Sequence, residues 1–251
     1  MVDLHCHILP GIDDGAKTVE DSVELLSAHR RQRIRSVMLT PHFNFERTDI
    51  KSFCERRAKS LELLTGSQEF VDTEITVKTG AEVFFSVRLN EEDIEPLCFE
   101  GTNYILIELP VNSRPYGLTH TLRALLNNGY IPILAHVERY PYIAEDPTVL
   151  YDLVMQGCLA QVNAGAILKD NERSKIAMKY LKWELAQVIS SDAHSMGKRP
   201  PNIKPAMSVI ESKLGSQYTR WLDKNSEDIF NGRYVDLPVV KKPKKLFGVW
   251  R

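Results

Sequence analysis

Histidine and carboxylate residues recur along this chain at spacings that suit metal ligation. His5 and His7 flank Cys6 at the end of the first apolar run, and Asp192 and His194 repeat the same one-residue spacing far downstream. Because side chains of an extended strand alternate between its two faces, each outer pair points to one side and can reach one ion. Cys6 is expected to point to the opposite side. One such pair is weak support for a metal site, since a single histidine at a strand end is more often a hydrogen-bonded loop residue.

The pattern becomes specific when all the strand ends are considered together. Five of the seven histidines and four carboxylates fall at predicted strand ends or in the loops that follow them. These residues are His5, His7, Asp14, His42, Glu82, Glu108, His136, Asp192 and His194. Zinc usually takes four ligands and magnesium or manganese about six, so this set predicts more than one metal ion. Nitrogen and oxygen donors without an obvious thiolate fit manganese, iron or zinc, and the sequence does not choose among them.

Two arginines indicate what such a metal centre would bind. Arg139 follows His136 by three residues, and Arg199 follows His194 by five. Guanidinium groups bind phosphate oxygens through two parallel hydrogen bonds and stay charged at every working pH. Surface arginines need no explanation on their own, but a pair at the mouth of a metal site favours phosphate capture. We therefore predict a metal-dependent phosphoester hydrolase with Arg139 and Arg199 as its catalytic residues.

Other reactive side chains receive structural assignments. His29 lies within a helical pattern and His120 follows a turn, so neither is expected to bind a metal. Asp14 has a plainer alternative role, because its carboxylate could simply brace the Gly11–Gly15 loop. The four cysteines are expected to be reduced thiols in a chain too large to need disulfides. None begins the Cys-x5-Arg motif of thiol phosphatases, since the residues six positions beyond them are Ile12, Ser60, Tyr104 and Ala164.

Short β-rich runs alternate with helical patterns along the chain and must position these groups. Strands are predicted at Val2–Leu4, Ser36–Thr40, Glu74–Lys78, Asn103–Leu109, Ile131–Ala135, Leu159–Val162 and Gln187–Ser190. Helices are predicted from Thr18, from Asp49 to Gly66, at about 117–128, 147–156, 172–184 and 202–214, and briefly at Asn225–Phe230. The strands are largely apolar on both faces, as strands covered on both sides are.

Seven strands alternating with helices predict an α/β fold, a distorted TIM-like (β/α)7 barrel, with a doubly wound open sheet as the alternative. The active site of such a barrel lies at the carboxyl ends of its strands, where the candidate ligands fall. A chain of 251 residues, 43% of them hydrophobic and without repeats or a flexible linker, is expected to form one domain over residues 1–251.

Charge and hydropathy exclude several classes of partner. The 32 lysines and arginines balance 33 acidic residues, so no overall positive field would hold nucleic acid or a membrane surface. No apolar run approaches the roughly 20 residues of a membrane span, and no leader pattern opens the chain, so we expect a cytoplasmic location. A basic tail at about 236–251 is expected to pack on the surface through its aromatic residues, with partner docking as the alternative. Its basic and apolar residues are Lys241, Lys242, Lys244, Lys245, Leu246, Phe247 and Trp250.

These motifs together resemble the PHP (polymerase and histidinol phosphatase) superfamily, and within it the bacterial manganese-dependent protein-tyrosine phosphatases of capsular and exopolysaccharide operons. The most specific segments are Asp3–Gly15, Thr40–His42, Gly80–Glu82, His136–Tyr140, Ser191–His194 and Arg199–Pro201. The resemblance spans most of the chain. It implies the PHP fold and a phosphatase that acts on a tyrosine-phosphorylated protein, namely a tyrosine kinase of polysaccharide synthesis.

The resemblance also implies a trinuclear site that holds three divalent metal ions, manganese first, with iron, zinc, cobalt and magnesium as alternatives. Its implied ligands are His5, His7, Glu82 and Asp192 for the first ion, Glu82, Glu108 and His136 for the second, and Asp14, His42 and His194 for the third. A metal-activated hydroxide would attack phosphorus while the two arginines hold the phosphoryl oxygens. A tyrosine phenol, whose pKa is about 10, leaves without an assigned general acid.

Three alternatives stay open. A histidinol-phosphate or other small-molecule phosphoesterase would share the metal site and differ in its rim. An amidohydrolase also uses a His-x-His pair, but that group places a modified lysine where this chain offers Glu82 and Glu108. A non-catalytic scaffold for a polysaccharide-synthesis kinase is disfavoured because no ligand position is lost. The sequence leaves the oligomeric state open.

Overall fold

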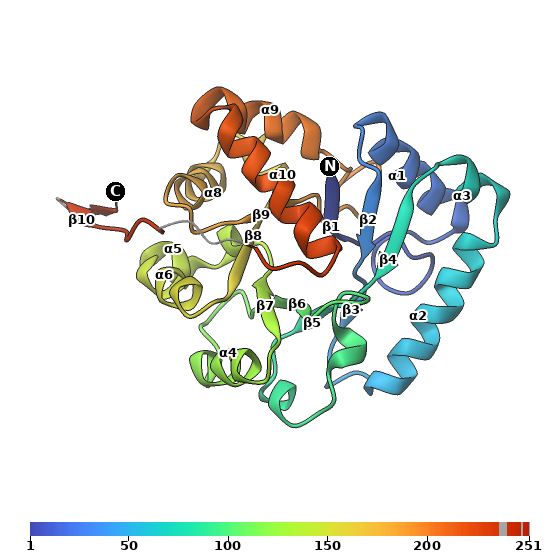
Figure 1. Cartoon of the computed structure of the whole chain (residues 1–251), viewed down its shortest axis with the longest axis horizontal. Helices are drawn as coiled ribbons and strands as arrows, with labels where there is room; N and C mark the ends of the chain where they lie inside the picture. The colour runs from blue at the N-terminus through green and yellow to red at the C-terminus, as the bar shows by residue number, and fades with distance from the viewer. Residues whose placement is uncertain (236–239, 247, 251) are drawn as a thin grey trace.

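The computed structural model describes residues 1–235, 240–246 and 248–250. Its architecture is mixed α/β, with a curled parallel sheet at the centre and helices packed around it (Figure 1). The strands of this sheet are β1 (Val2–Cys6), β2 (Ser36–Leu39), β3 (His42–Phe43), β4 (Thr76–Thr79), β5 (Glu82–Phe84), β6 (Tyr104–Glu108), β7 (Ile131–Leu134), β8 (Leu159–Asn163) and β9 (Val188–Ser190). The predicted α/β class is confirmed.

Two breaks divide the curled sheet. Strands β1, β2 and β4 pair in that order, and β3, β5, β6, β7, β8 and β9 continue the series, with every pair parallel. Strand β2 passes into β3 through Thr40 and Pro41, and β4 passes into β5 through Gly80 and Ala81. Pro41 has no N–H to donate, so it interrupts the ladder, while its carbonyl still accepts the Glu82 amide at 3.1 Å.

The first strand and the last one also meet. A parallel bridge joins Cys6 to Ala193, the His7 amide donates to the Ala193 carbonyl at 2.8 Å, and the Asp192 amide donates to the His5 carbonyl at 2.9 Å. The sheet therefore curls until its first and last strands meet, as in a distorted barrel. This brings the His5–His7 segment beside the Asp192–His194 segment.

Helices cover the outside of the sheet. They are α1 (Val19–Arg31), α2 (Ile50–Thr65), α3 (Gln68–Asp72), η1 (Val87–Asn90), η2 (Glu95–Leu97), α4 (Leu118–Asn127), η3 (Val137–Arg139), α5 (Pro141–Glu145), α6 (Thr148–Met155), α7 (Ala164–Ile167), α8 (Glu172–Lys182), α9 (Ile203–Leu214) and α10 (Ser216–Phe230). Thr18 and Asp21 form a capping box at the start of α1, where the helix was predicted to begin, and Asp49 caps α2 by accepting the Ser52 amide at 2.8 Å.

Some elements differ from the prediction. Strands β3 and β5 span only two and three residues, too few to show a periodic pattern. Helix α10 begins at Ser216 instead of Asn225, because Thr219 and Leu222 extend its buried face by almost two turns. Gly66 caps α2 with φ −76°, so the cap does not use the left-handed conformation that favours glycine.

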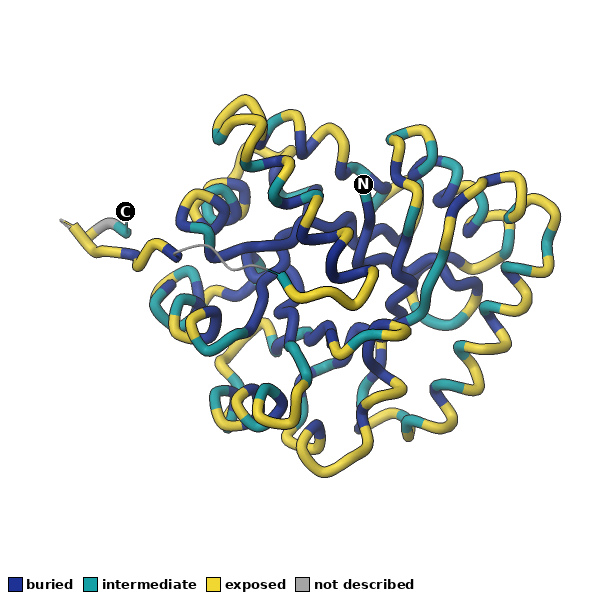
Figure 2. Tube along the Cα trace, viewed as in Figure 1, coloured by how far each residue is buried: buried dark blue, intermediate teal, exposed yellow. Residues whose placement is uncertain are grey.

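The core lies on both sides of the central strands. Strands β1 and β8 are buried along their whole length, and the exposed surface belongs mainly to the outer helices and loops (Figure 2). Burial on both faces explains the apolar runs of the sequence, because each strand contacts helices outside and other side chains inside. Within the described residues, every helix is too short or too polar to cross a membrane.

The chain ends in a small hairpin of β10 (Lys245–Leu246) and β11 (Val249–Trp250), which lies at one end of the molecule (Figure 1). The Trp250 indole donates to the Glu145 carbonyl at 2.9 Å, and Lys242 lies over the Tyr151 ring. Leu246 is exposed. Phe247 and residues 236–239, which belong to the predicted tail, lie outside the described residues.

Candidate metal centre

The predicted ligands converge at the carboxyl-terminal edge of the curled sheet. His5 is the penultimate residue of β1, and Glu108 ends β6. The remaining predicted ligands lie at the start of β3 and β5 or in loops after β1, β7 and β9. Among the described residues, three groups offer ligand atoms within 4.8 Å of one another. These groups are His7, Asp14, His42 and His194; His5, His7 and Asp192; and His42, Glu82 and Glu108. His136, the ninth predicted ligand, contacts the third group.

Four buried atoms are spaced like ligands around one ion. The Nε2 atoms of His5 and His7 lie 3.2 Å apart, and Glu82 Oε2 lies 3.3 and 3.2 Å from them. Asp192 Oδ1 lies 3.5 Å from His5 Nε2 and 3.6 Å from His7 Nε2. Ligands about 2.1 Å from a tetrahedral ion stand about 3.4 Å apart, so these separations match a coordination shell.

The hydrogen bonds of both imidazoles turn their other nitrogen toward that centre. His5 Nδ1 contacts Gln161 Oε1 at 3.2 Å, and His7 Nδ1 contacts Asp13 Oδ2 at 2.7 Å. Both partners are acceptors, so each Nδ1 carries the proton and each Nε2 keeps a lone pair. Two lone pairs facing each other at 3.2 Å require a cation or a proton between them.

The two carboxylates of this group also require a cation nearby. Glu82 Oε2 and Asp192 Oδ1 are buried and have no hydrogen-bond partner in the described part of the chain. An unpaired buried carboxylate oxygen is costly unless a cation neutralises it. Burial lowers the pKa of His7, but Asp13 and Glu82 outweigh it and raise that pKa to about 10. The surplus of negative charge that attracts a proton suits a divalent ion equally well.

Glu82 also links this group to the next one. Its Oε2 lies 3.0 Å from His42 Nδ1, and its Oε1 lies 2.8 Å from His136 Nε2. Glu108 lies farther out, 3.6 Å from His136 and 4.0 Å from His42. On its other side, His136 Nδ1 contacts the Tyr140 hydroxyl at 3.2 Å. One buried carboxylate therefore stands between two groups of ligands, as a bridging ligand does.

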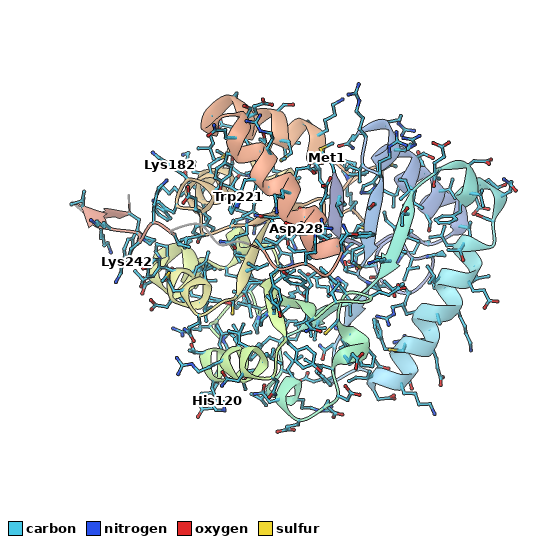
Figure 3. All side chains as sticks on the ribbon, viewed as in Figure 1. Met1, His120, Lys182, Trp221, Asp228 and Lys242 are labelled. Carbon is cyan, nitrogen blue, oxygen red and sulfur yellow. The ribbon has the colours of Figure 1, made fainter. Side chains whose placement is uncertain are left out.

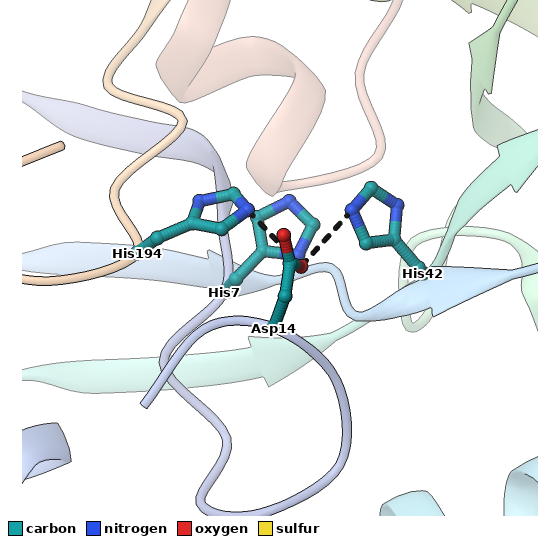
Figure 4. A group of neighbouring side chains, drawn as sticks. All are labelled: His7, Asp14, His42 and His194. Carbon is teal, nitrogen blue, oxygen red and sulfur yellow. Dashed lines mark ion pairs between the residues drawn. The ribbon is translucent and has the colours of Figure 1, made fainter. Parts of the chain in front are cut away.

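Asp14 closes the outer side of the cluster. Its Oδ1 lies 3.3 Å from His42 Nε2 and 3.4 Å from His194 Nε2, with His7 behind (Figure 4). His194 Nδ1 donates to the Asp192 carbonyl at 3.0 Å, so its Nε2 is the ring nitrogen that faces Asp14. Asp14 is 67% exposed, and this side opens into a cavity of about 700 Å³. A substrate can therefore approach the cluster from here.

Arg139 and Arg199 lie at the edge of the cluster that Asp192 and His194 form. Both donate to Asp192 Oδ2, Arg139 at 2.5 Å, and Arg199 also donates to His194 Nε2 at 2.8 Å. Burial favours the protonated form of Asp192, but His5 and Arg139 outweigh it and hold the Asp192 pKa well below its usual range. Both guanidinium groups also line a second cavity of about 280 Å³. They can therefore reach an anion that binds beside the cluster.

Two of the predicted ligands have left-handed backbones. His136 has φ +34° and Asp192 has φ +54°, a conformation that residues other than glycine seldom adopt. Both follow the last residues of a strand and turn their side chains into the cluster. Such local strain persists only where the surrounding structure enforces it, and it is common at functional sites.

Several supporting residues escaped the sequence analysis. Asp13 orients His7, and Gln161 contacts His5 and accepts the His136 amide at 2.8 Å. Asn163 receives a bond from Gln161 at 2.8 Å and donates to Asp192 at 2.7 Å. Gln161 and Asn163 share the alternate spacing of the first histidine pair at the end of β8. That spacing was the available signal, but amides are not typical metal ligands.

The residues assigned structural roles lie outside the cluster. His29 is buried, with Leu25 O and Asp3 Oδ2 each 2.8 Å from its ring nitrogens. His120 is exposed on α4, at the periphery of the molecule (Figure 3). The Cys6 thiol donates to the Met38 carbonyl at 3.3 Å, on the face opposite to its neighbouring histidines. The predicted orientation of Cys6 is confirmed, and His29 and His120 lie apart from the cluster.

Comparisons with known proteins agree with this picture. A family model described as "Capsular polysaccharide synthesis, CpsB/CapC" matches residues 1–231. The chain is 30% identical to tyrosine-protein phosphatase YwqE of Bacillus subtilis, over 99% of each chain. It is 31% identical to the putative tyrosine-protein phosphatase CapC of Staphylococcus aureus, over 99% of this chain and 100% of the relative.

A solved structure gives the same answer. It belongs to a set of crystal structures of YwqE from Bacillus subtilis and CpsB from Streptococcus pneumoniae, which are described as unique metal-dependent tyrosine phosphatases. The TM-score is 0.86 at 28% identity, and the match covers 97% of this chain and 100% of the other.

Proposed function

Because the chain belongs to the CpsB/CapC family of capsular polysaccharide synthesis, we propose that it is a metal-dependent protein-tyrosine phosphatase of capsule or exopolysaccharide production. The observation that carries this proposal is the group of His5, His7, Glu82 and Asp192. Its four facing donor atoms are buried, and the Glu82 and Asp192 oxygens have no partner within the described residues. Arg139 and Arg199 stand beside it, as phosphate chemistry requires.

We further assign three divalent ions to the cluster, with manganese as the first candidate. The proposed ligands are His5, His7, Glu82 and Asp192 for one ion, Glu82, Glu108 and His136 for another, and Asp14, His42 and His194 for the third. Support comes from the position of Glu82, whose two oxygens face different imidazoles at 3.0 and 2.8 Å. The curled sheet is accordingly proposed to be a PHP-type (β/α)7 barrel that forms one domain over residues 1–251.

The roles of the chain's own residues follow from their positions. Bound divalent ions would lower the pKa of coordinated water toward roughly 7 and so supply a nucleophile at neutral pH. Arg139 and Arg199 bind the phosphoryl oxygens and offset the charge that spreads over them during transfer. Asp192 holds both guanidinium groups in place. The tyrosine phenol, with a pKa of about 10, leaves without requiring a dedicated acid.

The proposed substrate is a tyrosine-phosphorylated protein, namely a tyrosine kinase that controls polysaccharide synthesis. Support comes from the cavity of about 700 Å³ on the Asp14 side, which Ile12 and Phe84 line together with polar residues. An aromatic side chain carried by a protein can enter such an open cavity. Kinase and phosphatase would meet where ATP is available, so we place the enzyme in the cytoplasm.

A substrate comparison with and without metal tests this function. The purified chain is incubated with a phosphotyrosine peptide or with histidinol phosphate, in manganese or after chelation. We expect manganese-dependent release of phosphate from the peptide and little from histidinol phosphate. Turnover that survives chelation would refute the metal mechanism. Faster hydrolysis of histidinol phosphate would instead favour the small-molecule phosphoesterase.

Two substitutions separate metal binding from phosphate binding. His136→Ala removes a proposed ligand and is expected to lower both bound manganese and turnover by at least tenfold. Arg139→Ala is expected to keep the metal but to lose one hundredfold or more in kcat/KM, since a charged donor to the phosphoryl group is gone. Metal content and phosphatase rate are measured on each variant. His120→Ala, on the exposed face of α4, serves as the control, and equal losses in all three variants would contradict the assignment.

A further inference from the structure

A second cavity lies beside the metal cluster and is not explained by the chemistry above. It has a volume of about 280 Å³ and lies where η3, the segment between α7 and α8, and the loop after His194 come together. Its cationic lining residues are Arg139, Lys169, Arg173, Lys198 and Arg199. The cavity can hold one or two side chains and excludes a folded domain.

The charge of this cavity is strongly one-sided. Arg139 and Arg199 pair with Asp192, whereas Lys169, Arg173 and Lys198 lie within 4.0 Å of no carboxylate in the described part of the chain. Cations held together without partners repel one another, so an incoming anion is attracted there.

Acidic groups do little to offset this charge. Glu138 is the single carboxylate among the described lining residues, and it is 3% exposed, with Asn163 N 3.4 Å away. Asn202 also lines the cavity, and its buried Oδ1 has no hydrogen-bond partner among the described residues. The cavity therefore has a cationic rim with one buried carboxylate beneath it, which suits an anionic ligand more than an apolar one.

The cavity continues directly from the metal cluster. Arg139 and Arg199 contact Asp192 on one side and line the cavity on the other. A phosphoryl group bound by these two arginines places the residues next to the phosphotyrosine near the cavity mouth. An extended peptide advances about 3.3 Å per residue, so a side chain two or three positions away can enter.

We infer that Lys169, Arg173 and Lys198 form a specificity subsite that binds an anionic side chain near the phosphotyrosine of the substrate. This inference rests on the proposed function and names the substrate class, an acidic phosphotyrosine segment. Carboxylate and phosphoryl groups share the chemistry that the subsite recognises, since lysine and arginine bind both. The subsite selects substrates and takes no part in breaking the phosphorus–oxygen bond.

Matched peptides test the subsite directly. Each carries a non-hydrolysable phosphonate in place of phosphotyrosine, with glutamate, phosphoserine or glutamine at flanking positions. Binding to the manganese-loaded full chain is followed by fluorescence anisotropy, and turnover of the phosphotyrosine versions is measured in parallel. We expect the glutamate peptide to bind about three- to tenfold more tightly than the glutamine peptide, with a preference that shrinks as ionic strength rises. The phosphoserine peptide shows whether a phosphoryl group is preferred to a carboxylate.

A charge-reversal pair provides the decisive variant. Arg173→Glu with Lys198→Glu is expected to abolish the preference for glutamate and to favour a lysine-flanked peptide, since the repulsive element is reversed. A misfolded variant would lose affinity for every peptide alike. A reversed preference therefore distinguishes a changed subsite from a misfolded protein. The control is Lys175→Glu with Lys182→Glu, which changes the net charge by the same amount at two exposed positions on α8, the helix that also carries Arg173. Lys182 is labelled in Figure 3. This control should keep the wild-type preference.

The outcomes separate the subsite from the proposed function. Turnover of phosphotyrosine without any preference for acidic peptides overturns the subsite and leaves the phosphatase intact. A preference in phosphonate binding without turnover of any phosphotyrosine peptide overturns the phosphatase and leaves the subsite intact. An unchanged preference in the Arg173 and Lys198 double variant also refutes the subsite.

Discussion

At the scale of single residues, Asp13 shows how one carboxylate can position two of the proposed ligands. Its Oδ2 lies 2.7 Å from His7 Nδ1 and accepts the His42 amide at 3.1 Å, while its Oδ1 accepts the Gly15 amide at 2.9 Å. The bond to His7 fixes the ring orientation and leaves Nε2 facing the cluster. Burial favours the protonated acid, but His7 outweighs it and keeps the Asp13 pKa below its ordinary value. Asp13 therefore remains an acceptor.

Asp13→Asn tests this supporting role. The amide keeps the volume of the carboxylate but loses its charge, so we expect manganese affinity to fall about 10- to 100-fold. Manganese titration by calorimetry provides the measurement. Asp72→Asn, at an exposed position on α3, is the control and should bind manganese like the wild type. Unchanged affinity in Asp13→Asn would show that His7 needs no charged partner at Nδ1.

At the scale of elements, the loop from Gly11 to Ala16 carries both Asp13 and Asp14. It folds back on the end of β1, because the Ala16 amide donates to the His7 carbonyl at 3.0 Å and the Gly11 amide donates to the Ala16 carbonyl at 2.9 Å. Gly15 packs against His7 so closely that a Cβ there would lie 2.0 Å from the His7 carbonyl oxygen. The position therefore requires glycine.

Gly15→Ala is accordingly expected to displace this loop. The clash involves backbone atoms that cannot move independently, so we expect about 2 kcal/mol of lost stability and a marked loss of manganese affinity. Thermal unfolding and manganese titration measure the two effects. Gly197→Ala is the matched control, since a Cβ there meets nothing within 4 Å. Wild-type manganese affinity in Gly15→Ala would mean that the loop tolerates rearrangement.

The elements also show where sequence patterns suffice. Alternation of apolar strands with capped helices predicted the α/β class, and strand ends marked every proposed ligand. The patterns failed at β3 and β5, where Pro41 and Gly80 interrupt each extended segment and leave two or three residues. They also failed for Gln161 and Asn163, because an amide is recognised as a supporting group only from its neighbours in space.

At the scale of the whole molecule, buried and surface charges stabilise the packing of its elements. Asp3 accepts the Ser191 amide at 3.1 Å, its other oxygen contacts His29, and it thereby joins β1 to α1 and to the end of β9. At the other end of the chain, Asp228 pairs with Lys224 and with Arg233 Nε, the latter at 2.8 Å (Figure 3). Asp3 also accepts the amide of His5, a proposed ligand, at 3.3 Å, whereas Asp228 pairs with none of the proposed ligands in the described part of the chain.

Asp228 gives the molecule an acid-sensitive contribution to stability. Lys224 lowers the Asp228 pKa, burial opposes it, and Arg233 lowers it further. Because the folded pKa lies below the unfolded value of about 3.9, the contribution is complete above that value and disappears as the pH falls through the folded pKa. We expect Asp228→Asn to cost about 1 kcal/mol at pH 7, since exposed partners are screened, and almost nothing near pH 2.

Urea unfolding of chelated wild type and variant at both pH values provides the measurement. Chelation keeps metal binding from contributing to the measured stability. Asp152→Asn, on the exposed face of α6, is the control. A difference between wild type and Asp228→Asn that stays constant down to pH 2 would contradict the ion-pair explanation.

The meeting of β1 with the segment after β9 has a consequence for biosynthesis. Asp3 and Ser191 are separated by 188 residues, and the proposed first ion takes ligands from both ends of that interval. Such high contact order delays folding, because the closing contacts wait for nearly the whole chain. A nascent chain on the ribosome, even one that has begun to fold from its N-terminus, therefore lacks Asp192 and His194 until late in translation. Catalytic competence thus requires that the segment carrying Asp192 and His194 has already been synthesised.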